Sequence, residues 1–253
     1  MLAEQRRSRI LEIVNAQGSI SVNDLHRRLE VSRETIRRDV TRLDADGRLR
    51  KTHGGALALT QSEPVFEERL SVNADGKRAI GRAAAAMIAD GASMLIDSGT
   101  TTICLAENLT ERQNLLVYTN DVHIAAKLAG RNNNRVLLTG GEYLASEGAM
   151  LGRDATVMLS NYYPDYAFVG ASAMSAHPWL MDYSREAAEL RAQMLSQART
   201  KVVLADHTKF DRTAPVRVPG FDQVDVIITD VPPSARMQRG FARIDAELVV
   251  AKG

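Results

Sequence analysis

The first 57 residues carry apolar positions at the spacing of amphipathic helices. In residues 6–20, RRSRILEIVNAQGSI, apolar side chains recur three and four positions apart, and the pattern stops at Gly18. Residues 21–29 and 33–45 repeat this spacing, each behind a serine that can cap a helix. The three apolar stripes consist of Ile10, Ile13 and Val14, then Val22, Leu25 and Leu29, then Ile36, Val40 and Leu43. The pattern predicts three short helices.

A tight turn, EVS at residues 30–32, separates the second and third helices, as in a helix-turn-helix. The side of the third helix opposite its apolar stripe carries Glu34, Thr35, Arg37, Arg38, Thr41 and Arg42. In such a motif the start of the last helix enters the major groove of DNA, where arginine pairs with guanine. A solvated basic face on a helical bundle is the alternative for the charges alone.

The residues that follow, RLRKTHGGA at 48–56, favour DNA binding over that alternative. Their alternation and double glycine predict a two-stranded wing, and its Arg48, Arg50, Lys51 and His53 are expected to lie along the phosphate backbone. Residues 1–57 contain twelve Arg and Lys against eight Asp and Glu, whereas the rest contains twenty against twenty-three. A basic head on a mildly acidic body favours a polyanion as the partner of the head alone.

From residue 77 onward, short Val/Ile/Leu runs alternate with helical patterns. The predicted strands are 93–96, 114–118, 135–139, 166–170, 201–205 and 224–229, and the predicted helices are 77–91, 103–109, 122–130 and 185–198. This alternation predicts an α/β domain with a mainly parallel, helix-covered sheet. No GxGxxG motif follows a strand, so a dinucleotide site is not expected.

Small and polar residues recur where these strands end. The segments are DSGTTT at 97–102, TND at 119–121, GGE at 140–142, GAS at 170–172 and DHTK at 206–209. Each alone reads most simply as a turn or a helix cap. Because ligands of parallel sheets collect beyond the carboxyl ends of the strands, five such segments together predict a polar pocket for a small molecule.

The segment DSGTTT has the features of a phosphate site. Gly99 allows backbone N–H groups to turn toward an anion, the threonine hydroxyls add donors, and the next helix contributes its positive end. Lys77, Lys209 and Arg191 are candidate cations, although each could simply be solvated. Asp97 would repel a phosphate, so it is assigned to sugar hydroxyls or to a nearby ammonium; a plain N-cap at Asp97 or Ser98 is the alternative.

Composition excludes several other classes. No apolar run reaches 18 residues and the N-terminus is charged, so neither a membrane span nor a secretory signal is expected, and the protein is expected to be cytoplasmic. Cys104 is the single cysteine, which excludes an internal disulfide and a multi-thiolate zinc site. The five histidines are scattered, so neither a metal nor a cofactor is expected.

The motifs also carry a resemblance to a family. VSRETIRRDVTRL and GRLRKTHGGA resemble the winged helix-turn-helix of the DeoR family of bacterial repressors. The segments from GKRAIG to DSGTTT, with YTND, LLTGGEY, EGAMLG, YAFVGAS and VVLADHTKF, resemble the sugar-phosphate-sensing domain of that family, which is similar to ribose-5-phosphate isomerase. LMDYSREA resembles the branch that contains glycerol-3-phosphate and sulfo-sugar repressors.

The resemblance implies roles for particular residues. Operator contacts are implied for Ser32, Arg33, Thr35, Arg37 and Arg38, although a helical wheel places Arg33 nearer the apolar edge. Effector contacts are implied for Lys77, Asp97, Ser98, Gly99, Thr100, Thr101, Asn120, Gly141, Asp206 and Lys209. Two positions depart from the family pattern: Arg191 stands where lysine is usual, and Asp121 stands where serine is common.

We therefore expect three parts: a winged helix-turn-helix at 1–57, a linker at 58–76, and an effector and oligomerisation domain at 77–253. The expected function is a transcriptional repressor, not an enzyme, that a phosphorylated sugar or polyol releases from double-stranded operator DNA. Since one head makes few base contacts, a homodimer or homotetramer on repeated half-sites is expected. A sugar-phosphate isomerase, with Asp97, Asp206 and Lys209 as its chemical groups, and an architectural DNA binder are the alternatives.

Overall fold

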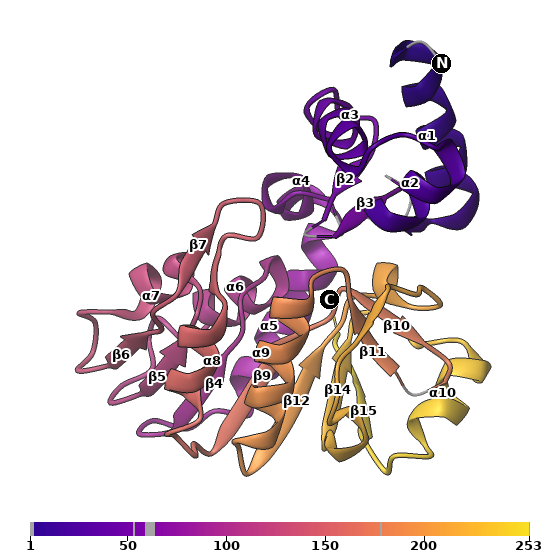
Figure 1. Cartoon of the computed structure of the whole chain (residues 1–253). Coiled ribbons are helices and arrows are strands. Elements are labelled where there is room, and N and C mark those ends of the chain that lie inside the picture. Colours follow the sequence, from indigo (N-terminus) through magenta and orange to yellow (C-terminus); the bar gives the residue numbers. More distant parts are fainter. Residues whose placement is uncertain (1–2, 53, 59–63, 178, 253) are drawn as a thin grey trace. The chain divides into compact units, whose positions relative to one another are not determined.

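The computed structural model describes residues 3–52, 54–58, 64–177 and 179–252. The chain divides into two compact units, Met1–Glu63 and Pro64–Gly253, coloured from indigo to yellow along the sequence in Figure 1. Each unit has its own apolar core.

The N-terminal unit contains three helices and a small antiparallel sheet. The helices are α1 (Ala3–Gln17), α2 (Val22–Leu29) and α3 (Arg33–Ala45), and the strands are β1 (Ser19–Ser21), β2 (Arg50–Lys51) and β3 (Gly55–Leu57), in the order β1-β3-β2. The predicted apolar stripes meet in the core, where Ile10, Leu25 and Ile36 are fully buried. The predicted wing is confirmed as β2 and β3, and β1 adds a third strand to it.

The start of each of the last two helices is fixed by a serine. Ser21 Oγ accepts a hydrogen bond from the backbone N–H of Asp24 at 3.0 Å, and Ser32 Oγ accepts one from Thr35 at 3.2 Å. Glu30 ends α2 in the left-handed conformation, at φ 54°. These caps hold the short turn that the helix-turn-helix requires.

A parallel sheet forms the centre of the C-terminal unit, as the alternating pattern predicted, and it has seven strands, one more than the six predicted. Its strands are β4 (Ser93–Ile96), β5 (Leu116–Thr119), β6 (Arg135–Leu138), β9 (Tyr166–Gly170), β12 (Thr200–Leu204), β14 (Val226–Thr229) and β15 (Glu247–Val250). Their order is β15-β14-β12-β9-β4-β5-β6. The chain grows from β4 toward β6 and then returns to the other side of β4, so the topological switch point lies between β4 and β9.

Helices cover both faces of this sheet (Figure 1). α5 (Ala74–Ala86), α6 (Thr100–Glu107) and α7 (Val122–Leu128) pack on one face against Met94 and Ile96. α8 (Arg153–Leu159), α9 (Arg185–Ser196) and α10 (Ala235–Phe241) contribute to the apolar cluster on the other face, which contains Leu95. The alternation along β4 shows why a strand buried on both sides reads as an unbroken apolar run.

Two glycines permit close backbone approaches. A Cβ on Gly81 of α5 would lie 2.5 Å from the carbonyl carbon of Cys104 on α6, so the two helices touch backbone to backbone. Gly141 has a φ of +119°, and a Cβ there would lie 2.4 Å from the carbonyl oxygen of Leu151. Neither position accommodates a larger side chain without movement of the backbone.

Several short elements were not predicted. Residues 66–71, inside the stretch predicted as a linker, form α4 (Phe66–Ser71), and α5 begins at Ala74 instead of Lys77. A hairpin of β7 (Glu142–Leu144) and β8 (Ala149–Leu151) follows β6, and β10 (Ala173–Ser175), β11 (Trp179–Asp182) and β13 (Val216–Arg217) form a small antiparallel sheet. No helix in the described part of the chain is long and apolar enough to cross a membrane.

Candidate functional site

The N-terminal unit presents the predicted DNA-contacting residues on the outside of α3. Arg33, Arg37 and Arg38 are exposed, with Ser32 at the cap and Thr35 half-buried beside it. Arg33 is the first residue of α3, and its side chain is exposed although the helical wheel places it nearer the apolar edge. With Arg42, which is also exposed, α3 therefore carries four exposed guanidinium groups.

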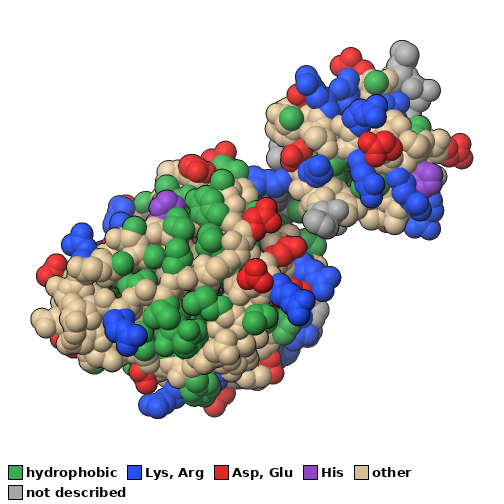
Figure 2. Space-filling model, turned by 60° about the vertical axis from the view of Figure 1, so that its left-hand side comes forward, with side chains coloured by type: hydrophobic (Ala, Val, Ile, Leu, Met, Phe, Trp, Pro, Cys, Tyr) green, Lys and Arg blue, Asp and Glu red, His purple; other side chains and the backbone are tan. Residues whose placement is uncertain are grey.

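The wing adds further cations. Arg48 and Lys51 are exposed and Arg50 is half-buried; His53 lies outside the described residues. Lysine and arginine side chains gather on the surface of this unit in Figure 2. These positions suit contacts with the sugar-phosphate backbone.

A partly buried ion pair, which the sequence analysis missed, fixes α3 against α1. Asp39 lies on the inner side of α3, and its Oδ2 accepts from Arg6 Nε at 2.5 Å. The hydrogen bond to Asp39 raises the pKa of the Arg6 guanidinium. The partners are 33 positions apart, so spacing along one helix gave no signal for the pair.

In the C-terminal unit, the predicted effector residues at 97–101, together with Asn120, gather where β4 and β5 end, beside the switch point. Asn120 holds the loop after β4: its Oδ1 accepts from the backbone N–H of Ser98 at 2.9 Å, and its Nδ2 donates to Ser98 Oγ at 3.2 Å. The same amide donates to the carbonyl of Met150 on β8 at 3.3 Å. The β7–β8 hairpin, which also packs on Gly141, thereby belongs to the frame of the site.

The start of α6 is suited to an anion. Gly99 precedes the helix at φ +146°, and no side chain caps it. Thr100, Thr101 and Thr102 form its first turn and are buried, with Thr102 Oγ1 donating to the Gly99 carbonyl at 2.8 Å. Uncapped N–H groups at a helix start, together with nearby hydroxyls, make an anion-binding geometry.

Asp121 supports this loop from the neighbouring strand. Its Oδ1 caps α7 by accepting from the N–H of His123 at 2.7 Å, while its Oδ2 accepts from the Gly99 N–H at 3.4 Å. Burial raises the pKa of this carboxyl group. The departure from the family's serine therefore places a carboxyl group directly behind the anion loop.

Arg191 has a different setting from the one predicted. Its Nε donates to Asp97 Oδ2 at 2.6 Å, and its Nη1 contacts the carboxylate of Asp182. Asp97 also accepts from the Gly170 N–H at 3.0 Å, and Asp182 accepts from Ser172 Oγ at 3.0 Å. The Arg191 guanidinium is thus buried between the carboxylates of Asp97 and Asp182. The cation beside Asp97 is this guanidinium and not an ammonium group. Asp182 was not among the predicted residues.

Lys77 and Asp206 lie at the ends of α5 and β12. Lys77 is only 3% exposed, its Nζ donates to the backbone carbonyl of Arg69 at 2.5 Å, and burial lowers its pKa despite the attraction of Asp206. Asp206 Oδ1 accepts from Thr208 Oγ1 at 2.6 Å, whereas its buried Oδ2 has no hydrogen-bond partner among the described residues. Lys209 is half-buried in the short 3₁₀ helix η2 (His207–Lys209).

A second polar cluster, also missed from sequence, adjoins these groups. Asn73 Nδ2 donates to Asp230 Oδ2 at 2.7 Å and lies 3.4 Å from Asp206 Oδ1. His207 donates its backbone N–H to Asp230 Oδ1 at 2.7 Å. A Cβ on Gly76 would lie 2.4 Å from Asp230 Oδ2, so a larger residue there would displace the Asp230 or Asn73 side chain.

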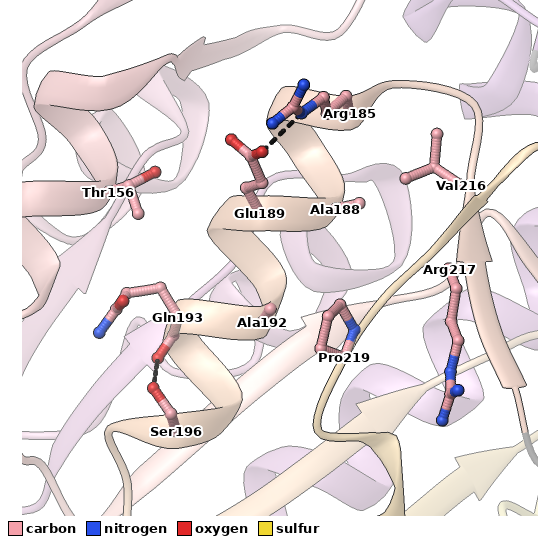
Figure 3. Close-up of a pocket in the computed structure, with 10 residues that line it drawn as sticks. All are labelled: Thr156, Arg185, Ala188, Glu189, Ala192, Gln193, Ser196, Val216, Arg217 and Pro219. Carbon is pink, nitrogen blue, oxygen red and sulfur yellow. Dashed lines mark hydrogen bonds and ion pairs between the residues drawn. The ribbon is translucent and has the colours of Figure 1, made fainter.

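A separate groove runs along the outer side of α9 (Figure 3). It is lined by Thr156, Arg185, Ala188, Glu189, Ala192, Gln193, Ser196, Val216, Arg217 and Pro219. Arg185 Nε and Glu189 Oε1 form an exposed ion pair across its rim at 2.7 Å. The groove contains none of the predicted effector residues. Arg191 lies on the same helix, but its side chain is buried inside the domain.

Both units match known domains. Residues 6–62 match the DeoR-like helix-turn-helix domain, and residues 72–231 match the DeoR C terminal sensor domain. The chain belongs to the DeoR family. The resemblance seen in the sequence is therefore confirmed over most of the chain.

Relatives within the DeoR family cover nearly the whole length. The chain is 30% identical to the glycerol-3-phosphate regulon repressor of Escherichia coli (strain K12), over 92% of this chain and 93% of that protein. It is 31% identical to the HTH-type transcriptional regulator GlpR of Haloferax volcanii, over 91% of each. Among solved structures, ribose 5-phosphate isomerase A of Methanocaldococcus jannaschii is similar over 55% of each chain, with 18% identity and a TM-score of 0.40. The chain is thus a DNA-binding transcriptional regulator of the DeoR type.

Proposed function

We propose that this regulator is a repressor of a sugar or polyol catabolic operon, and that a phosphorylated sugar or polyol releases it from its operator. The N-terminal domain type and the name of the E. coli relative support repression. The observation that carries the effector class is the uncapped, hydroxyl-rich start of α6 at the switch point of the sheet. A phosphate monoester is the kind of anion that such a helix start binds.

The remaining groups suit the rest of a small polyol ester. Thr100, Thr101 and the backbone after Gly99 would hold the phosphate, with Lys77 and Lys209 contributing positive charge. Asp206 Oδ2, buried without a hydrogen-bond partner among the described residues, would accept from a hydroxyl of the ligand. Ser98, Asn120 and Gly141 would shape the loops, and Arg191 would position Asp97 in place of contacting the phosphate.

The same proposal covers DNA. Ser32, Arg33, Thr35, Arg37 and Arg38 would enter the major groove, and Arg48, Arg50, Lys51 and His53 would contact phosphates. Two or four copies would bind repeated half-sites, since one head provides few base contacts. A regulator of this kind acts in the cytoplasm, where bacterial operators are located.

The contacts of Asp97 do not favour the isomerase alternative. An aldose–ketose isomerase needs a carboxylate base that can reach the C1–C2 unit of its substrate. Asp97 Oδ2 instead accepts from both Arg191 and the Gly170 N–H, so it is engaged within the protein.

A ligand panel tests the proposal. The full chain is heated with glycerol 3-phosphate, ribose 5-phosphate or fructose 6-phosphate, each compared with its unphosphorylated counterpart. At least one ester should raise the Tm and weaken binding to a duplex that the wild-type chain has selected from random sequence. The unphosphorylated counterparts should do neither. Equal responses to an ester and its unphosphorylated counterpart, or selection of no duplex, would refute the proposal.

A further inference from the structure

Helix α4 is the first element of the C-terminal unit and follows the N-terminal unit in the chain. Of its six residues, Phe66 and Arg69 are buried, while Leu70 is 47% exposed. A helix this short has little stability of its own, so its docking depends on a few contacts with the rest of the unit.

The first contact is made by the C-terminal end of α4. The Arg69 carbonyl accepts from Lys77 Nζ at 2.5 Å, and the Arg69 side chain pairs with Glu147 at 3.1 Å. Lys77 is buried beside Asp206 and Lys209, and both act on it electrostatically. The Lys77 ammonium therefore donates to α4 and also interacts with charged residues of the candidate effector site.

The second contact is made by the N-terminal end of α4. The Phe66 ring stacks on His123 with centroids 5.1 Å apart and planes 4° apart, and its N–H donates to the Ser146 carbonyl at 3.1 Å. His123 lies in the first turn of α7, whose cap, Asp121, accepts from the Gly99 N–H. One end of α4 thus rests on His123, whose helix cap contacts the anion loop, and the other end is held by Lys77, which interacts with Asp206 and Lys209.

From these contacts we infer that α4 is the relay between effector and DNA, and that a bound phosphate and the Arg69 carbonyl compete for the ammonium of Lys77. This inference rests on the proposed function. A charged phosphate is a stronger partner for an ammonium than a neutral carbonyl, so an effector at the start of α6 draws Lys77 away from α4. Docked α4 then corresponds to the DNA-binding state, and undocked α4 to the released state.

Undocking weakens DNA binding by lengthening the chain segment that connects each N-terminal unit to its C-terminal unit. While α4 is docked, the connection from each head to its sensor unit is short, and the heads of an oligomer reach two half-sites at a high effective concentration. Undocking adds the residues of α4 to the connection and lowers that concentration. No contact between head and DNA has to change.

Hydrogen exchange on the full chain, without any added sugar phosphate, tests whether Lys77 and Phe66 hold α4 in its docked position. Lys77→Met removes the donor to Arg69, and Phe66→Ala removes the stack on His123; Phe66→Leu serves if the alanine variant does not fold. Each variant should speed exchange of the amides at 66–71 by about tenfold or more, because local opening governs their exchange. Leu70→Ala, at an exposed position of the same helix, should leave that exchange unchanged. Wild-type exchange in Lys77→Met would overturn the inference.

DNA binding by the same variants separates this inference from the proposed function. With the selected duplex and no effector, Lys77→Met and Phe66→Ala should bind about 5- to 150-fold more weakly than wild type, the range of ordinary allosteric coupling. If Lys77 only bound effector, Lys77→Met would keep full affinity and lose its response, and the relay would be wrong. If both variants weaken binding while no phosphate ester affects wild type, the effector class is wrong and the relay stands.

Discussion

Arg191 Nε donates to Asp97 Oδ2 across 2.6 Å, and both side chains are buried where β4 ends. Because the same guanidinium contacts Asp182 at the end of β11, one cation joins the parallel sheet to the small antiparallel sheet. The planar fork of arginine serves two carboxylates at once, which the lysine usual at this position in the family would do less well.

Arg191→Met should therefore lower the free energy of unfolding by about 3–5 kcal/mol, since it leaves two buried carboxylates without their cation. Urea denaturation followed by circular dichroism measures this. Arg185→Met, which breaks an exposed pair on the same helix, is the matched control and should leave the urea midpoint unchanged. An Arg191→Met midpoint equal to that of the control would contradict the prediction.

Arg38→Ala should weaken binding to the selected duplex by about 5- to 150-fold, because a bidentate arginine–guanine contact contributes about 1–3 kcal/mol. Fluorescence anisotropy measures the affinity. Stabilisation by a phosphate ester should be retained, because Arg38 belongs to the other unit. Arg9→Ala removes an exposed arginine of α1 and should change affinity less. Loss of both responses in Arg38→Ala would show that the two units do not act separately.

Thr101→Val and Lys209→Ala should keep DNA affinity and abolish release by the effector. The first variant removes a hydroxyl from the start of α6, and the second removes a cation beyond β12. Release is followed as the loss of anisotropy on titration with the active ester. Thr110→Val, just beyond the other end of α6, serves as the comparison and should release normally. Normal release by either test variant would place the phosphate elsewhere.

Asp121→Asn should change how stability depends on pH. Burial raises the folded-state pKa of Asp121, so the unfolded chain ionises first as the pH rises through the ordinary value near 3.9. Wild type should therefore lose stability relative to Asp121→Asn as the pH rises from about 3.9 to the raised value, and the difference should stay constant above it. Asparagine retains the oxygen that caps α7. Urea titrations at several pH values measure the difference, and a constant difference throughout would show that the raised pKa is wrong.

The sequence predicted those elements whose signals are local. The stripe of Ile36, Val40 and Leu43 identifies α3, and continuous apolar runs identify the parallel strands, because both patterns follow from which side of an element is buried. Strand ends of a parallel sheet share one edge, so the segment containing Asp97 and Gly99 could be located before the sheet order was known.

What the sequence did not reveal depends on partners distant in the chain. Asp39 and Asp182 look like surface charges until Arg6 and Arg191 are placed beside them. Helix α4 has too few residues to show a helical period. The roles of Phe66 and Arg69 become evident only from their contacts with His123 and Lys77. The DNA-contacting and effector-contacting residues remain predictions that the variants above test.

The backbone contact between α5 and α6 at Gly81 has a mechanical consequence. Lys77 and Thr100 belong to these two helices, and at Gly81 the contact between main-chain atoms resists sliding of one helix along the other. The backbones of the two helices should move as one rigid unit, so a change in the distance between the Lys77 ammonium and the anion loop requires movement of the Lys77 side chain. Cys104, the single native thiol, sits at this junction, so a probe attached there would report on this rigid unit without further engineering.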